Sequence, residues 1–426
     1  MMREPHAGSG PFPPGPLAGL RVLELADEKG QYCGKLMGDL GADVIKVEPP
    51  GGEGTRAVGP FLNDIPHRER SLSFWHYNTS KRGITLNPDT RQGRHLVQRL
   101  VSSADILLES RPPGYLPSLG LGYDELSRLN PRLIMCSLTP FGQTGPWRDY
   151  RTSDLLHLAA GGQMSCCGYD PEDVPDAPPI APGGGNAWHM GGHYAYMATL
   201  AAIYYRDMSG EGQYIDASIH EACALTTESN VPIYIYTGQG VLRHTGRAAS
   251  PDKTDPTQFP TGDGGWVNIT RSGFNLTPPR LRKLAEWMDS YGLAQDLLDE
   301  KYRSVAAIQA NTSHIAEVLH RFFAHIPLEE SWRGGQEQGM PWGGVRSMDE
   351  ILDDPHLHER GFFVEVPHPE LGRSFTYPGP AAIYNGSPWR ISRLAPLIGE
   401  HNAEVLCGEL GLRQEELAVL AESGVI

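Results

Sequence analysis

The 426-residue sequence lacks the features that mark several common protein classes. It has six cysteines but no Cys-x-x-Cys pair, so neither a disulfide framework nor a zinc site is expected. Its most apolar stretch, residues 195–205, is far shorter than the ~20 residues that a membrane span needs. Residues 1–16 lack the apolar centre of a signal peptide and are expected to form a flexible lead. We therefore expect a reduced, cytoplasmic setting and no membrane partner.

Positive charge is scarce over the whole chain but is concentrated in one segment. The sequence has 36 Lys and Arg against 51 Asp and Glu, a net charge of −15, which argues against binding to nucleic acids or anionic membranes. Residues 67–99 nevertheless carry seven bases and only two acids. Such a segment suits a small polyanion, because guanidinium and ammonium groups bind phosphates at short range. The three arginines between residues 91 and 99 are interpreted as a solvated helix face, whereas Lys81 and Arg82 are predicted to contact the ligand.

The signatures of several enzyme classes are also absent. The sequence has neither Gly-x-Gly-x-x-Gly after its first strand nor Gly-x-x-x-x-Gly-Lys-Ser/Thr, so the two common phosphate-binding loops are excluded. Gly-x-Ser-x-Gly and His-Glu-x-x-His are missing too, which leaves no support for a hydrolase or a zinc protease. His189 and His193 are four residues apart on an expected helix, but no third ligand has a fitting spacing. We therefore expect no metal cofactor.

What the sequence does contain is a regular alternation of strand and helix patterns. Repeated strand–helix–strand units predict a doubly wound parallel sheet, which is an α/β fold. In such a sheet the turn after the first strand is the usual place for a ligand. The expected strands are residues 20–25, 43–48, 105–109 and 133–138, and the expected helices are residues 32–40, 91–101, 123–129, 153–164 and 189–207. A second unit is expected to open with a strand–turn pattern at residues 259–269 and to continue with helices at residues 278–291 and 314–323.

Several segments together resemble the family III CoA-transferases, the group of formyl-CoA transferase, the L-carnitine and bile-acid-inducible enzymes and 2-methylacyl-CoA racemase. They include PLAGLRVLEL, CGKLMGDLGADVIKVEPPGG, SKRGITLN, SGEGQYIDASIHEA and DPHLHERGFF, and they occur in family order. The resemblance implies an enzyme that moves CoA between an acyl-CoA thioester and a carboxylic acid. It further implies CoA thioesters as substrates, no metal, and a homodimer whose two chains are interlocked.

The resemblance also implies a domain organisation and a set of CoA contacts. A Rossmann-like large domain is expected at residues 17–240, a smaller α+β domain at residues 245–353, and a C-terminal segment that returns to the large domain at residues 354–426. The positions that match the family's CoA-binding loops are Lys29, Gly30, Gln31, Lys81, Arg82, Leu86, Ser110, Arg111 and Arg151.

One position departs from the family pattern at the centre of its chemistry. Family transferases use an aspartate that attacks the donor thioester and then carries CoA as an aspartyl thioester. Here that position falls on Trp188, or on Ala187 if one residue is skipped, and neither side chain is a nucleophile. Asp154 and His189 are the candidate catalytic residues that remain nearby. The histidine that racemases of the family place before this acid is replaced by Ser153.

Three hypotheses follow from this departure. The first is a CoA-transferase whose carboxylate is Asp154 or one of the four acids in residues 170–176, namely Asp170, Glu172, Asp173 and Asp176. The second is non-covalent chemistry on an acyl-CoA, such as isomerisation, racemisation or hydration, with His189 as acid or base and Asp154 as its partner. The third is a CoA-binding homologue without catalysis.

Overall fold

The computed structural model describes residues 13–227, 230–247, 249–269 and 276–426. Its contacts divide the chain into two compact units. Unit 1 comprises the described parts of Met1–Gly161, Gly183–Thr226 and His356–Ile426, and unit 2 comprises those of Gly162–Pro182 and Thr227–Pro355. Residues 162–182 and 227–240, which the sequence-based division places in the large domain, are thus grouped with unit 2. One reason is that the Asp170 backbone N–H donates to Thr245 Oγ1 at 2.9 Å.

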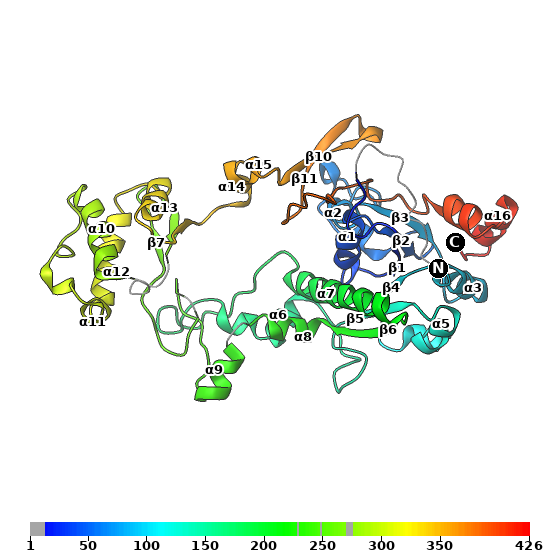
Figure 1. Cartoon of the computed structure of the whole chain (residues 1–426), viewed down its shortest axis with the longest axis horizontal. Coiled ribbons are helices and arrows are strands. Elements are labelled where there is room, and N and C mark those ends of the chain that lie inside the picture. The colour runs from blue at the N-terminus through cyan, green and yellow to red at the C-terminus, as the bar shows by residue number, and fades with distance from the viewer. Residues whose placement is uncertain (1–12, 228–229, 248, 270–275) are drawn as a thin grey trace. The chain divides into compact units, whose positions relative to one another are not determined.

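Unit 1 is built on a six-stranded parallel sheet (Figure 1), which confirms the predicted α/β class. The strand order is β3-β2-β1-β4-β5-β6. The central strands are buried on both faces, as expected for a parallel sheet covered by helices on each side. The strands are β1 (Arg21–Leu25), β2 (Asp43–Glu48), β3 (Lys81–Thr85), β4 (Ile106–Glu109), β5 (Ile134–Thr139) and β6 (Gln213–Ser218).

Helices cover both faces of this sheet. On one face, α3 (Arg91–Val101) and α5 (Tyr123–Leu129) contribute to the hydrophobic core under β1, β2, β4 and β5. On the other face, α7 (Asn186–Ser209) contacts β5, β6 and α1 (Gln31–Asp39). A Cβ atom on Gly192 of α7 would lie only 3.2 Å from the Tyr32 ring, so glycine lets α7 and α1 approach closely. Unit 1 also contains α2 (Leu72–Tyr77), α4 (Tyr115–Ser118), α6 (Asp154–Ala160) and α8 (Ile219–Leu225).

The C-terminal part of the chain closes the β3 edge of the sheet. The β3 backbone N–H groups of Gly83 and Thr85 donate to His401 Nδ1 at 3.1 Å and to Asn402 Oδ1 at 2.8 Å. The His401 N–H donates in return to the Gly83 carbonyl at 2.9 Å. These bonds satisfy groups that an edge strand would otherwise present unpaired. The C-terminal elements are the hairpin β10 (Phe363–His368) and β11 (Arg373–Pro378), the π-helix Ala403–Glu409 and α16 (Gln414–Glu422).

Unit 2 is a smaller mixture of helices with an antiparallel sheet. Its sheet order is β7-β8-β9, and its core contains aromatic and aliphatic side chains such as Phe259, Leu284, Phe322 and Trp342. The strands are β7 (Gln258–Pro260), β8 (Trp266–Asn268) and β9 (Gly343–Gly344). The helices are α9 (Asn230–Thr237), α10 (Pro278–Asp289), α11 (Val305–Gln309), α12 (Thr312–Phe323), α13 (Leu328–Glu337) and α14 (Met348–Leu352), and the chain passes to unit 1 at α15 (Pro355–Glu359).

Candidate functional site

The strand order reverses between β1 and β4, which makes their carboxyl ends the natural ligand crevice of this sheet. From β1 the chain proceeds outward through β2 and β3, and it then returns to β4 on the other side of β1. Ligands of open α/β sheets bind where two neighbouring connections leave in opposite directions in this way. The turn after β1 contains Lys29, Gly30 and Gln31, and the turn after β4 contains Ser110 and Arg111. The fold therefore gathers five of the predicted CoA-binding residues at one edge.

Asp27 ties these two turns together. Its carboxylate accepts bonds from Ser110 Oγ at 2.7 Å and from the Lys29 N–H at 3.1 Å, and it pairs with the Lys29 ammonium. Burial opposes the ionisation of Asp27, but the charge of Lys29 and the bonds from Ser110 hold its pKa below the ordinary value. A Cβ atom on Gly30 would lie 2.7 Å from Ala26 Cβ, so the turn requires glycine. The result is a rigid, tightly wound turn at the start of α1.

A second carboxyl group, that of Glu109, lies directly beneath the β4 turn. Glu109 is the last residue of β4, it is 3% exposed, and its Oε2 accepts the Arg111 backbone N–H at 2.6 Å. Burial raises the Glu109 pKa to about 7, although nearby Ser137 and Arg111 favour the ionised form. The Nε atom of Arg111 is buried and has no hydrogen-bond partner among the described residues.

Lys81 and Arg82 are the first two residues of β3, and the Lys81 ammonium donates to the Gln31 carbonyl of the turn after β1 at 2.8 Å. Lys81 is fully buried, and its Nζ pairs with Glu24 at 2.8 Å. Burial lowers the Lys81 pKa to about 8. Arg82 forms ion pairs with Asp43 at 2.7 Å and with Glu404 at 2.8 Å. Both cations therefore neutralise carboxylates of the protein itself.

Leu86 and Arg151 are separate from the gathered residues. Leu86 follows β3 and is 1% exposed in the core that α3 covers. Arg151 is exposed in the segment before α6. Of the nine predicted CoA contacts, five thus lie in the two turns, and a sixth, Lys81, contacts one of these turns through the Gln31 carbonyl.

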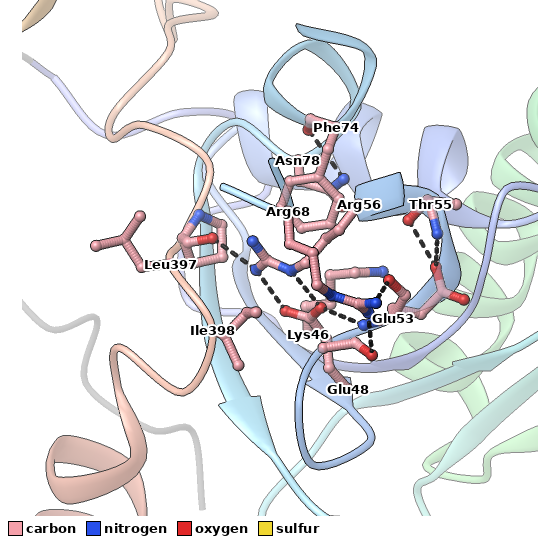
Figure 2. Close-up of polar contacts among 12 residues, drawn as sticks. Lys46, Glu48, Glu53, Thr55, Arg56, Arg68, Phe74, Asn78, Leu397 and Ile398 are labelled. Carbon is pink, nitrogen blue, oxygen red and sulfur yellow. Dashed lines mark hydrogen bonds and ion pairs between the residues drawn. The ribbon is translucent and has the colours of Figure 1, made fainter. Parts of the chain in front are cut away.

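A buried charge network lies at the carboxyl end of β2 (Figure 2). Arg56 donates from Nε and Nη2 to the two carboxylate oxygens of Glu48 at 2.6 and 2.7 Å. Its Nη2 also donates to the Pro396 carbonyl at 2.7 Å, and its Nη1 pairs with Glu69 at 2.6 Å. The guanidinium carbon lies 3.9 Å from the centroid of the Phe74 ring. This network fastens the C-terminal segment to the loop that follows β2.

The carboxylate of Asp154 reaches the position that is predicted from the sequence to correspond to the family's nucleophile. Asp154 is the first residue of α6, where the Ser153 hydroxyl caps the helix by accepting the Leu156 N–H at 3.1 Å. Asp154 Oδ1 accepts the backbone N–H of Ala187 at 2.8 Å, in the first turn of α7. Ala187 is buried and Trp188 is half-buried. A carboxylate is thus present beside residues 187–188, although it comes from another helix.

His189 lies in the first turn of α7, two residues after Ala187, and its imidazole forms a hydrogen bond with the Tyr77 hydroxyl. The Tyr77 hydroxyl and His189 Nε2 are 2.8 Å apart, and the Tyr32 ring lies 4.6 Å from the imidazole. Burial and the neighbouring His193 lower the His189 pKa, while the charge of Asp154 acts in the opposite sense. Burial raises the Tyr77 pKa, and Asp154 adds to that effect. Asp154, His189 and Tyr77 therefore share one electrostatic environment.

Three further residues of this site, Tyr32, Tyr77 and His157, are not marked by any motif in the sequence. His157 is fully buried, with Nε2 at 2.6 Å from Thr152 Oγ1 and its ring 5.7 Å from that of Trp188. Burial lowers its pKa to about 4, so the ring is neutral at physiological pH. Their only sequence signal is weak: Tyr32 and Tyr77 are aromatic residues close to the segments CGKLMGDLGADVIKVEPPGG and SKRGITLN, which resemble the family.

The acids of residues 170–176 are engaged within unit 2. Asp170 accepts the Glu172 N–H at 2.9 Å and pairs with His244 at 3.1 Å, and these bonds lower its pKa to about 2. Lys253 Nζ lies 3.3 Å from Glu172 and 3.2 Å from Asp173. Three of these four acids therefore stabilise a loop by ion pairing.

Two structural findings concern metal binding and membrane insertion. Within the described ranges, no group of three or more His, Cys, Asp or Glu side chains is arranged to hold a metal ion. None of the helices in those same ranges is long and apolar enough to cross a membrane.

Comparison with known proteins agrees with this fold. Residues 17–402 match the model of CoA-transferase family III, so the chain belongs to that family. It is 34% identical to succinyl-CoA–D-citramalate CoA-transferase of Chloroflexus aurantiacus, over 97% of this chain and 99% of the relative. It is 33% identical to succinyl-CoA:(R)-benzylsuccinate CoA-transferase subunit BbsE of Thauera aromatica, over 95% and 97% of the two chains. The crystal structure of a CAIB/BAIF family protein from Brucella suis matches with a TM-score of 0.77 and 28% identity, over 93% of this chain and 99% of that one. The protein is accordingly a CoA-transferase, which moves CoA between an acyl-CoA thioester and a carboxylic acid.

Proposed function

We propose that the CoA substrate binds at the carboxyl ends of β1 and β4. Its phosphates would lie against Lys29, the start of α1 at Gly30 and Gln31, and the turn of Ser110 and Arg111. Two observations support this placement. Helix α1 begins without a side-chain cap and without an acid in its first turn, which suits an anion at its amino terminus. The Arg111 Nε has no partner in the described protein.

Lys81, Arg82 and Leu86 are left out of this proposed CoA site. Lys81 and Arg82 already donate to buried or half-buried carboxylates, and withdrawing either from its partners would leave a charge unpaired. The Leu86 side chain is in the core. Arg151 is exposed and stays a proposed CoA contact.

The observation that carries the proposed chemistry is the contact between Asp154 Oδ1 and the Ala187 N–H. Asp154 attacks the donor thioester carbonyl through Oδ2, the C–S bond breaks, and a mixed anhydride and the CoA thiolate form. The thiolate then attacks the aspartyl carbonyl, which releases the donor carboxylate and leaves an aspartyl-CoA thioester. The acceptor carboxylate passes through the same two steps in reverse and regenerates Asp154.

In this proposal, His189 and Tyr77 stabilise the charge that develops on the thioester oxygen. If His189 Nε2–H donates to Tyr77, the tyrosine O–H is left to donate to that oxygen. A prepositioned donor of this kind stabilises the transition state more than the ground state. The lowered His189 pKa supports a neutral ring that can orient the tyrosine.

We propose dicarboxylic acids as the substrate class. Both curated relatives named above are transferases of succinyl-CoA, and their acceptors, D-citramalate and (R)-benzylsuccinate, are dicarboxylates. The cationic Arg111 at the crevice is compatible with anionic acyl groups as well as with phosphates, whereas Lys29 is paired with Asp27.

The test is a transferase assay with succinyl-CoA and a panel of dicarboxylic acids, read by mass spectrometry of the CoA esters and of the intact protein. The wild-type chain should form a new CoA thioester and a covalent CoA adduct. Asp154→Asn should lose both, while keeping an oxygen that accepts the Ala187 N–H. Asp207→Asn, at a side chain 59% exposed, is the matched control. An Asp154→Asn enzyme with wild-type turnover would refute Asp154 as the nucleophile.

A second candidate is that this chain is one of two different subunits and that its partner supplies an aspartate. The Trp188 position favours it, and so does the relative BbsE, which is named as a subunit. Turnover by the purified chain alone would exclude it. CoA binding without turnover, followed by turnover on addition of a family III chain that carries the aspartate, would establish it. Trp188→Asp should then make this chain active alone.

The chain is also proposed to work as a dimer, whether with itself or with such a partner. Large apolar side chains on one side of α7 are exposed, namely Met197 at 51%, Tyr204 at 71% and Met208 at 72%. A run of this kind on a long helix is typical of a contact surface. Light scattering after size exclusion should give a mass of two chains, and Tyr204→Lys should shift it towards one.

A further inference from the structure

Glu109 is a buried carboxyl group that the transfer chemistry above does not use. It ends β4 at the proposed CoA edge, where the register sets it beside Leu25 of β1 and Ser137 of β5. Its bond to the Arg111 N–H joins it to the turn that carries a proposed phosphate contact. A carboxyl group 3% exposed at this place is costly to ionise and therefore calls for a functional explanation.

Two buried polar atoms near Glu109 have no hydrogen-bond partner among the described residues. Thr139 Oγ1 and Arg111 Nε are buried and have no hydrogen-bond partner within the described part of the chain, whereas Ser137 interacts with Glu109 itself. Ser137 is 1% exposed and Thr139 is fully buried. Buried polar groups are nearly always paired in folded proteins, so two exceptions around the ends of β4 and β5 indicate a place built for more than stability.

We propose that Glu109 is a positioning residue that sets how far the Arg111 guanidinium is free to reach a phosphate of CoA. This inference rests on the proposed CoA site. In either protonation state, an oxygen of Glu109 accepts the Arg111 N–H and holds the turn. When the carboxyl group is ionised, its charge retains the guanidinium, and when it is neutral, the guanidinium is released to the substrate.

The charged and titratable groups that face Glu109 come from four elements. Asp27 in the turn after β1 disfavours its ionisation, and Arg111 in the turn after β4 favours it. Cys136 of β5 and Tyr214 of β6 also interact with it electrostatically, but burial raises the pKa of both to about 12. With these two neutral near pH 7, Glu109 is the group whose change of charge near pH 7 acts on Arg111.

The test is calorimetric titration of the full chain with CoA at pH 6, 7 and 8. Wild-type affinity should be lower at pH 8 than at pH 6. Glu109→Gln mimics the neutral acid, so at pH 8 it should bind CoA about three- to tenfold more tightly than wild type, the effect of one charge-assisted contact. Glu109→Ala removes the acceptor for the Arg111 N–H and should bind more weakly at every pH. Glu211→Gln, at an exposed position, is the control.

A double-mutant comparison separates this inference from a general effect on folding and from the CoA site itself. In an Arg111→Gln background, Glu109→Gln should change neither the affinity for CoA nor its pH dependence, because Glu109 is proposed to act on CoA binding through the Arg111 side chain. An equal effect of Glu109→Gln in both backgrounds would overturn the inference. So would a Glu109→Gln protein that binds CoA less tightly than wild type at pH 8. If the wild-type chain binds no CoA, the proposed CoA site itself is wrong, a result distinguishable from the other two.

Discussion

Replacing Arg56 tests the charge network at the end of β2 most directly. The Arg56 guanidinium is 1% exposed and makes a two-pronged contact with Glu48, which is itself fully buried. Burial opposes the ionisation of Glu48, but the bonds and charge of Arg56 keep its pKa below the ordinary value. Arg56→Met keeps most of the volume and leaves the Glu48 carboxylate without its main partner.

The expected loss follows from the cost of an unpaired buried charge. Breaking a buried ion pair on one side costs about 3–5 kcal/mol, and the Pro396 carbonyl also loses its donor. Because these contributions overlap, we predict that Arg56→Met lowers the free energy of unfolding by about 4 kcal/mol at pH 7. Arg56→Lys keeps a charge but not the two-pronged geometry, so we expect a loss of about 2 kcal/mol.

Urea unfolding, followed by circular dichroism and tryptophan fluorescence, measures both variants. The control is Arg282→Met, whose side chain is 70% exposed in its pair with Glu286, and it should change stability by less than about 0.5 kcal/mol. The Glu48 pKa is depressed in the folded state, so its contribution is present above about pH 4.5 and is lost as the pH falls through the folded pKa. The difference between wild type and Arg56→Met should therefore shrink in acid. An Arg56→Met protein within 1 kcal/mol of wild type at pH 7 would refute this reasoning.

Three further outcomes are expected. Gly34→Ala would place a Cβ atom 1.7 Å from the Glu24 carboxylate and should destabilise the protein by about 3 kcal/mol or more, whereas Gly54→Ala, with open space at its Cβ, should leave the melting temperature nearly unchanged. Because the folded Glu109 pKa is about 7 against an ordinary 4.5, its burial costs stability progressively as the pH rises from 4.5 to 7. Urea unfolding should therefore show that the free energy of unfolding of Glu109→Gln, relative to wild type, is about 2–3 kcal/mol greater at pH 8 than at pH 5. An equal difference between the two proteins at both pH values would contradict the raised pKa. Tyr77→Phe should lower kcat about tenfold with little change in KM, as expected for a donor to the transition state, and an unchanged kcat would remove Tyr77 from the proposed chemistry.

The elements of the sheet were largely predictable because local patterns specify them. The limits of β2 and α3 agree with those expected, at residues 43–48 and 91–101. Helix α6 ends at Ala160 rather than at residue 164, because Gly161 and Gly162 follow and Gly162 has a left-handed backbone with φ of 96°. The strand order then brings the two turns of the proposed CoA site together by a general rule of parallel sheets.

Partners far apart in sequence were not predictable from local patterns. The expectation that Lys81 and Arg82 contact a ligand depended on counting bases within one segment and on the positions of the family's CoA-binding loops. Their carboxylate partners lie elsewhere, with Glu24 57 residues before Lys81 and Glu404 322 residues after Arg82. The contact of Tyr77 with His189 spans 112 residues. Only the fold brings such side chains together. The charged residues could therefore be identified from one sequence, but their partners could not.

The closure of the β3 edge has a consequence for how the protein is made. Asn402, which bonds to the Thr85 N–H, follows it by 317 residues. At about 5–20 residues per second, a ribosome needs about 15–60 s to add that length. During this interval the nascent sheet exposes an unpaired strand that neighbouring nascent chains could add to. Expression at low temperature or with a chaperone that occupies strand edges should therefore raise the yield of folded protein more than it raises synthesis.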